Sequence, residues 1–90
     1  MTNEAILLAW LRRQLASGSG AADICTHEVE EVPKYALDYH FKRVTVGVIT
    51  RLWRQVRIDG TLALAGIRVQ DVSGEYPNRK EATWRVQRNS

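Results

Sequence analysis

The sequence predicts an α+β domain in which a three-helix core is followed by a C-terminal two-stranded β-hairpin. Residues 45–58 carry the strongest helical periodicity of the chain, and residues 67–87 contain two runs in which apolar and polar side chains alternate. Such alternation is typical of half-buried strands. Because 90 residues suffice for one core, we expect a single domain over residues 1–90.

The first predicted helix spans about residues 3–16. Leucine recurs at every fourth position from Leu7 to Leu15, and Trp10 lies beside this stripe. Asn3 is the expected N-cap, because its side chain can accept a hydrogen bond from a free amide of the first turn.

The stretch from 21 to 32 allows two interpretations. It follows a Ser-Gly-Ser-Gly loop that ends the first helix. Ile24 and Thr26 could belong to a short strand, or Thr26 could cap a helix that runs through Glu30. The sequence leaves both open.

Two further helices are predicted downstream. Pro33 suits the first turn of a helix over about residues 33–40. A longer helix over about residues 45–58 can be capped by Thr45 and closed by Gly60. At about 100° per residue, its apolar face contains Val46, Ile49, Leu52, Trp53 and Val56, and its opposite face contains Gly47, Arg51 and Arg54, flanked by Thr50 and Gln55.

The hairpin region is predicted over about residues 61–87. Residues 61–64 are expected to be an extended connection, and a turn-rich, partly basic loop over 73–81 joins the two strands. The alternation predicts that Ile67, Val69, Ala82, Trp84 and Val86 point inward, and that Arg68, Gln70, Thr83, Arg85 and Gln87 point outward.

Charge is distributed unevenly along the chain. Residues 1–41 carry a net charge of −3, whereas residues 42–90 carry +6. A basic half attached to an acidic half favours a polyanionic partner for the second half. A solvated charged surface would give the same composition, so charge alone does not decide.

Several protein classes are disfavoured. The longest apolar run, Ala5–Leu11, is far shorter than the roughly 20 residues of a membrane-spanning helix, and no secretion signal precedes it. Cys25 is the single cysteine, so no intramolecular disulfide can form. We expect a cytoplasmic protein without a membrane partner.

No catalytic or cofactor motif is visible. Cys25, His27 and His40 lack the spacing of a metal site and have no evident fourth ligand. A glycine-rich phosphate loop and a nucleophile elbow are also missing. We expect no enzymatic activity, no cofactor and no bound metal.

The order of the elements, together with three local patterns, carries a family resemblance. The patterns are Tyr35–Tyr39 with its small residue Ala36, the run Thr45–Leu52 opening with Thr-Val, and Gly60 before the hairpin. The chain resembles the winged helix-turn-helix superfamily. The resemblance implies a three-helix core with a β-hairpin wing, a recognition helix over 45–58, and binding to double-stranded DNA.

The physical chemistry of the same residues favours DNA as well. An α-helix fits the major groove, where an arginine can donate two hydrogen bonds to guanine, and cations on a hairpin can contact phosphates. Gly47 costs up to about 1 kcal/mol in a helix relative to alanine, and its missing side chain would allow close approach of DNA. The predicted DNA-binding residues are Arg43, Thr45, Gly47, Thr50, Arg51, Arg54, Arg68, Arg79, Lys80 and Arg85.

A bacterial or phage regulator or replication accessory factor fits this size. The alternative function is a winged helix that binds a protein instead of DNA, because this fold serves both purposes. Arginines free for phosphate would indicate DNA, whereas arginines paired with the acidic cluster of Glu28, Glu30 and Glu31 would indicate a structural role or a protein interface. A homodimer, if formed, is expected to use Trp10 and the leucines of the first helix.

Overall fold

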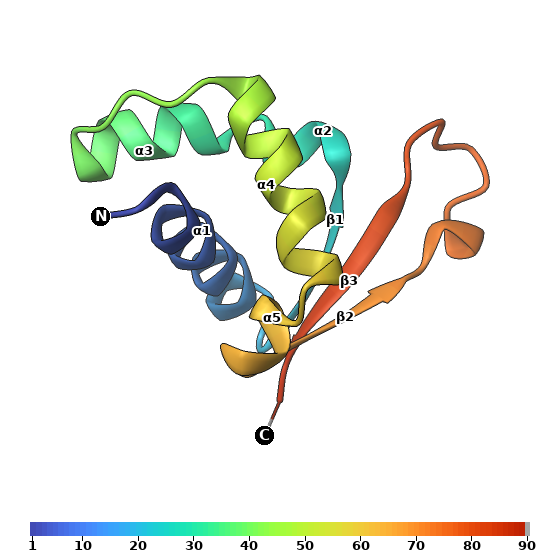
Figure 1. Cartoon of the computed structure of the whole chain (residues 1–90). Coiled ribbons are helices and arrows are strands. Elements are labelled where there is room, and N and C mark those ends of the chain that lie inside the picture. Colours follow the sequence, from blue (N-terminus) through green and yellow to red (C-terminus); the bar gives the residue numbers. More distant parts are fainter. Residues whose placement is uncertain (90) are drawn as a thin grey trace.

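Helices pack against one face of a three-stranded antiparallel sheet in the computed structural model, which describes residues 1–89 (Figure 1). Ser90, the last residue of the predicted domain, lies outside the described residues. Among the helices of this range, none combines the length and apolar character needed to cross a bilayer. The elements are α1 (Asn3–Ser17), β1 (Ala21–Cys25), α2 (Thr26–Val29), α3 (Val32–His40), α4 (Val46–Ile58), α5 (Thr61–Leu64), β2 (Ile67–Asp71), the 3-10 turn η1 (Ser73–Glu75) and β3 (Thr83–Arg88).

The three main predicted helices are confirmed to within one residue at each end, as α1, α3 and α4. The predicted cap of α1 is wrong. Thr2, not Asn3, is the N-cap, and its Oγ1 accepts a hydrogen bond from the Ala5 amide at 3.1 Å. Both residue types can cap a helix, and the hydroxyl one residue earlier takes that position.

Both interpretations of residues 21–32 are partly realised. Residues 21–25 form the strand β1, and the four-residue helix α2 follows at once. The N-cap of α2 is Cys25, whose amide and thiol both donate to Oε1 of Glu28 at 3.3 Å. Thr26 is therefore the first residue of α2 and does not cap it.

Residues 61–64 form the short helix α5, so the predicted extended connection is wrong. Gly60 adopts a left-handed φ of 83°, and Asp59 accepts a hydrogen bond from the Thr61 amide at 2.9 Å. This helical turn buries Leu62 in the core. The burial of Leu62 favours a helical turn over residues 61–64. The local pattern of these four residues is too short to predict that conformation.

The sheet has three strands in the order β1-β3-β2, so the predicted two-stranded hairpin is incomplete. The strands β2 and β3 pair as predicted, with Val69 opposite Val86. On its other side β3 pairs with β1, where Asp23 lies opposite Arg85. The central strand is therefore the last one in the sequence. Its pairing with β1 joins distant parts of the chain, which local patterns do not reveal.

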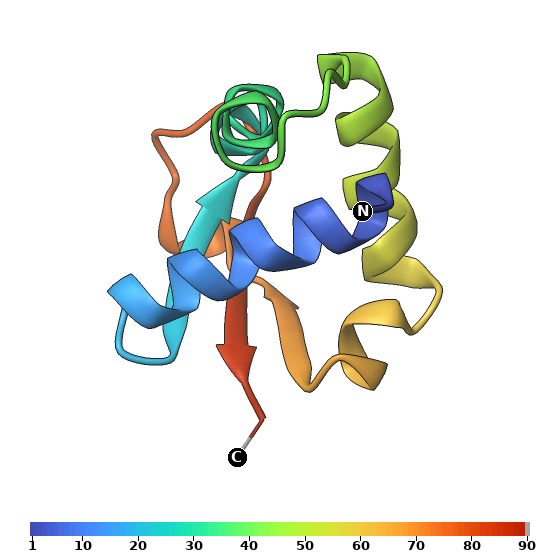
Figure 2. The same cartoon turned by 90° about the vertical axis from the view of Figure 1, so that its left-hand side faces the viewer.

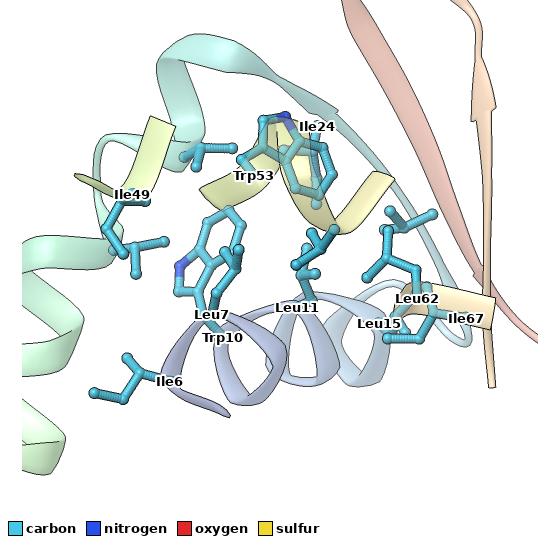
Figure 3. Close-up of a cluster of buried hydrophobic side chains, with 14 of the residues drawn as sticks. Ile6, Leu7, Trp10, Leu11, Leu15, Ile24, Ile49, Trp53, Leu62 and Ile67 are labelled. Carbon is cyan, nitrogen blue, oxygen red and sulfur yellow. The ribbon is translucent and has the colours of Figure 1, made fainter. Parts of the chain in front are cut away.

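The core lies between the helices and the sheet (Figure 3). Figure 2 shows α1 crossing the helix-covered face of the sheet. Trp10 and the leucine stripe of α1 are buried in this core, so the interface predicted for a homodimer is wrong. Since these side chains already fill the core of one chain, they are not available for contact with a second copy.

Three positions differ from the predicted burial. Val46 is 43% exposed, because it is the first residue of α4 and lies at the edge of the apolar face. In β3, Thr83 is buried and Ala82 is exposed. The amide of Thr83 donates to Oγ of Ser73 at 3.0 Å, because the hairpin loop folds back over the start of β3.

An ionic network holds this loop on the outer face of the sheet. Arg85 donates two hydrogen bonds to Asp23, at 2.8 and 3.0 Å, and one to Glu75 at 3.1 Å. The hydroxyl of Tyr76 also donates to Asp23. The hydrogen bonds from Arg85 lower the pKa of Asp23 below its ordinary value near 3.8, although desolvation partly offsets them. The hydrogen bond that the Tyr76 hydroxyl donates to Asp23 raises the pKa of Tyr76.

Replacing Asp23 by asparagine is expected to lower the stability of the domain at pH 7. Because the pKa of Asp23 is lowered on folding, its charge stabilises the folded state fully above about pH 3.8 and loses this effect as pH falls through the folded-state pKa. The difference in urea midpoint between wild type and Asp23→Asn should therefore shrink at pH 3. Asp38→Asn is the control, since Asp38 pairs with Lys34 on the exposed surface of α3. A difference between wild type and Asp23→Asn that is independent of pH would contradict the ionic role.

Candidate nucleic-acid interface

Helix α4 is held in place along one side only. Its N-cap is Thr45 as predicted, with Oγ1 accepting from the Val48 amide at 3.2 Å. Ile49, Trp53 and Val56 are buried in the core. This anchoring fixes the orientation of the helix and leaves the opposite side to solvent.

The opposite side of α4 presents Gly47, Arg51 and Arg54, all exposed as predicted. At about 100° per residue these three positions fall within one arc of the helix. Thr50 is half-buried at the edge of this arc. We call this surface, formed by Gly47, Thr50, Arg51 and Arg54, the arginine face.

The arginines of this surface carry uncompensated charge. Within residues 1–89, no carboxylate lies within 4.0 Å of Arg43, Arg51 or Arg54. The acidic cluster has other partners: Glu28 accepts from the amide and thiol of Cys25, and Glu30 lies 3.8 Å from His27. The pairing that would have indicated a structural role for the arginines is therefore not seen in the described part of the chain.

Arg57 was missed by the sequence analysis and has a different role. Its guanidinium lies 4.1 Å from the ring centre of Trp84 and 5.1 Å from that of Trp53. Burial lowers its pKa. The side chain links α4 to β3 through cation–π contacts and is not part of the arginine face. Its position next to the apolar stripe was the only hint in the sequence.

The basic residues of the hairpin loop lie at the α2 end of the sheet. The guanidinium of Arg79 lies 4.2 Å from the ring centre of Tyr76, and Glu81 accepts a hydrogen bond from the His27 amide at 2.8 Å. Arg79 and Lys80 line a shallow depression of about 440 Å³ beside α2. In Figure 2 this loop and α4 lie on opposite sides of α3. The structure thus does not bring these two cations together with the arginine face.

The other two predicted hairpin residues also differ from each other. Arg68 is exposed on the edge strand β2, next to α5, where it lines a shallow depression with Arg57 and Gly60. Arg85 is held by Asp23 and Glu75 on the outer face of the sheet. Its hydrogen-bonding capacity is largely used within the protein, so Arg85 is a structural residue here.

An apolar groove that the sequence analysis did not anticipate lies beside the start of α4. It has a volume of about 670 Å³. Its apolar lining residues are Pro33, Leu37, Val44 and Val48, and Arg43 is among its polar lining residues. Phe41, in the turn between α3 and α4, is 90% exposed and has a left-handed φ of 52°. Exposed apolar residues are common on protein surfaces, so an apolar residue in the sequence does not by itself indicate a binding surface. The groove and the exposed Phe41 were therefore recognised only from the fold.

Histidine and cysteine side chains take part in local contacts. His40 Nε2 lies 3.2 Å from the hydroxyl of Tyr35, and the thiol of Cys25 is bonded to Glu28. Within residues 1–89, no three His, Cys, Asp or Glu side chains gather closely enough to hold a metal ion.

No family model matches the chain, and neither the curated proteins nor the solved structures contain a significant match.

Proposed function

We propose that this chain is a double-stranded DNA-binding protein of the winged helix-turn-helix type, acting without catalysis as a transcriptional regulator or a replication accessory factor. The single observation that carries the proposal is the arginine face of α4, whose two guanidiniums have no acidic partner within residues 1–89. An exposed helix face with free arginines has the shape and charge that fit a major groove.

The order of the elements supports the winged-helix part of the proposal. A helix, a strand, two helices and a hairpin follow one another, and the strand order is β1-β3-β2. In this arrangement α3 and α4 form the helix-turn-helix, and β2 with β3 forms the wing. The short helices α2 and α5 are additions to the three-helix core.

The proposed mechanism assigns separate tasks to the cations. Arg51 and Arg54 enter the major groove and donate to base edges, while Arg43 at the turn contacts the backbone. Arg68 contacts phosphates that flank the base-reading helix, and Arg79 and Lys80, which lie apart from the arginine face, contact phosphates further along the duplex. These contacts add affinity without sequence information. Arg85 is left out, because it is already paired with Asp23.

The test is a titration of the whole chain against random-sequence duplex DNA at 50 and 200 mM salt. Each phosphate neutralised by a cation releases counterions, so we expect an affinity that falls steeply between the two salt concentrations, with a dissociation constant of about 10⁻⁴–10⁻⁶ M near physiological salt. Absence of binding at 50 mM salt would contradict the proposal.

Gly47→Ala is expected to stabilise the domain and weaken DNA binding at the same time. Alanine favours a helix by about 0.5–1 kcal/mol over glycine, and a Cβ at this position meets open space. On DNA, the added methyl group would occupy the contact zone of the arginine face. Thermal unfolding and a DNA titration measure the two effects, with Gln55→Ala as a control on the flank of the same helix. A stabilised variant with unchanged affinity would mean that Gly47 does not approach DNA.

The second candidate function is a protein-interaction module, which the apolar groove between α3 and α4 favours. Pro33, Leu37 and Val44 line it, and an apolar side chain of a partner could bury there. This function predicts that DNA binding is absent at low salt and that Leu37→Asp abolishes capture of a protein partner without unfolding the domain. We prefer the DNA-binding function, because the groove does not account for the free arginines on α4.

A further inference from the structure

We infer that the first turn of α4 recognises thymine methyl groups, with Val46 as the principal contact, while Arg51 and Arg54 recognise guanine further along the same helix. The inference rests on the proposed major-groove binding. It adds the class of base pair that each end of α4 selects.

Val46 is exposed where the helical pattern predicts burial. It is the first residue of α4, and 43% of its surface is accessible, whereas Ile49 and Val56 on the same helix are buried. Its neighbour Gly47 has open space beyond its backbone. The apolar side chain of Val46 therefore lies next to Gly47, whose missing side chain allows a ligand to approach the helix backbone closely.

The hydroxyl groups at this end of the helix are engaged with the backbone of α4. Oγ1 of Thr45 accepts from the Val48 amide at 3.2 Å, and the hydroxyl of Thr50 donates to the Val46 carbonyl at 2.9 Å. The side chains of the first turn therefore offer mainly methyl groups to a partner. Among the base edges of the major groove, thymine alone presents a methyl group, and apolar side chains recognise it by contact.

The occupant is argued from charge. Arg51 and Arg54, which lack acidic partners within residues 1–89, lie on the solvent-facing side of α4, about 100° around the helix from Val46. A polyanion complements these guanidiniums, and an apolar protein surface does not. Duplex DNA fits both the arginines and the apolar first turn of α4, because its major groove presents guanine acceptors and thymine methyl groups.

The helix geometry sets the distance between the thymine that Val46 contacts and the guanine that Arg54 contacts. From Val46 to Arg54 an α-helix rises by about 12 Å. Successive base pairs are about 3.4 Å apart. We therefore expect thymine and guanine positions separated by about three to four base pairs in a preferred site.

The test compares thymine with uracil, which differ only in this methyl group. A site is first selected from a randomised duplex library with the wild-type chain. The dissociation constant is then measured for the selected duplex and for the same duplex with uracil at each thymine. Val46→Ala is the test variant. Ile58→Ala is the matched control, because Ile58 is also exposed on α4 but lies about 18 Å further along it.

Wild type should bind the uracil duplex about fourfold more weakly for one critical thymine, since a buried CH₂-sized group contributes about 0.8 kcal/mol. Val46→Ala should bind the thymine duplex about fourfold more weakly and no longer distinguish thymine from uracil, whereas Ile58→Ala should still distinguish them. Equal affinity of wild type for the two duplexes, or loss of the distinction in Ile58→Ala, overturns the inference while salt-sensitive binding keeps the proposed function. No binding to any duplex overturns the proposed function itself.

Discussion

An Arg51→Ala/Arg54→Ala variant is expected to bind a preferred duplex at least about thirtyfold more weakly than wild type. Each arginine that reads a base contributes about 1–3 kcal/mol, and 1.4 kcal/mol corresponds to a tenfold change. Both side chains project from the exposed side of α4 and touch no carboxylate within residues 1–89. Their removal should therefore leave the fold intact, which circular dichroism can verify.

Two further double variants separate base reading from simple loss of charge. Arg12→Ala/Arg88→Ala removes the same charge from exposed arginines on α1 and β3, and its effect should be small. Arg79→Ala/Lys80→Ala should weaken binding to every sequence alike and reduce the salt dependence. If the Arg12/Arg88 variant lost as much affinity as the Arg51/Arg54 variant, binding would depend on net charge and not on α4.

Trp53→Ala is expected to destabilise the domain by about 3–5 kcal/mol. Trp53 is 1% exposed and anchors α4 to the core (Figure 3). The guanidinium of Arg57 lies 5.1 Å from the centre of its ring. Since small domains are stable by only about 5–15 kcal/mol, this variant should be close to unfolding at room temperature. Urea denaturation followed by circular dichroism measures the change.

A milder substitution keeps this prediction testable even when the alanine variant does not fold. Trp53→Phe retains most of the apolar volume and should lose less stability than Trp53→Ala. Where Trp53→Phe is folded, its affinity for DNA should stay near wild type, in contrast to the arginine variant. A loss below about 1 kcal/mol for Trp53→Ala would show that α4 is not anchored at this residue.

The helices were predictable because their signals are local. The leucine stripe of α1, Pro33 at the start of α3 and the cap Thr45 of α4 all act within a few residues of their own positions. The exposed side of α4 followed from the same periodicity, so Arg51 and Arg54 were found without the structure. Val46 was misassigned because periodicity does not tell where a helix end leaves the core.

The hairpin residues were less predictable, because their environment is built by distant parts of the chain. Arg85 lies in an alternating strand that the sequence presents as exposed, yet it pairs with Asp23 on a strand 62 positions away. Arg79 and Lys80 lie in a loop that folds back toward α2, where Glu81 bonds to the His27 amide. Neither contact leaves a mark in the local pattern.

The sequence by itself determined the α+β class, the positions of α1, α3 and α4, the pairing of β2 with β3, and the composition of the arginine face. Those features depend on periodicity and capping, which act over one or two helical turns or along one strand. Only the tertiary structure decided that β3 is the central strand, that Leu62 makes α5 helical, and that Arg85 and Arg57 serve the fold. These outcomes depend on which distant groups share the core or face one another across the sheet, and such contacts are set when the whole chain packs.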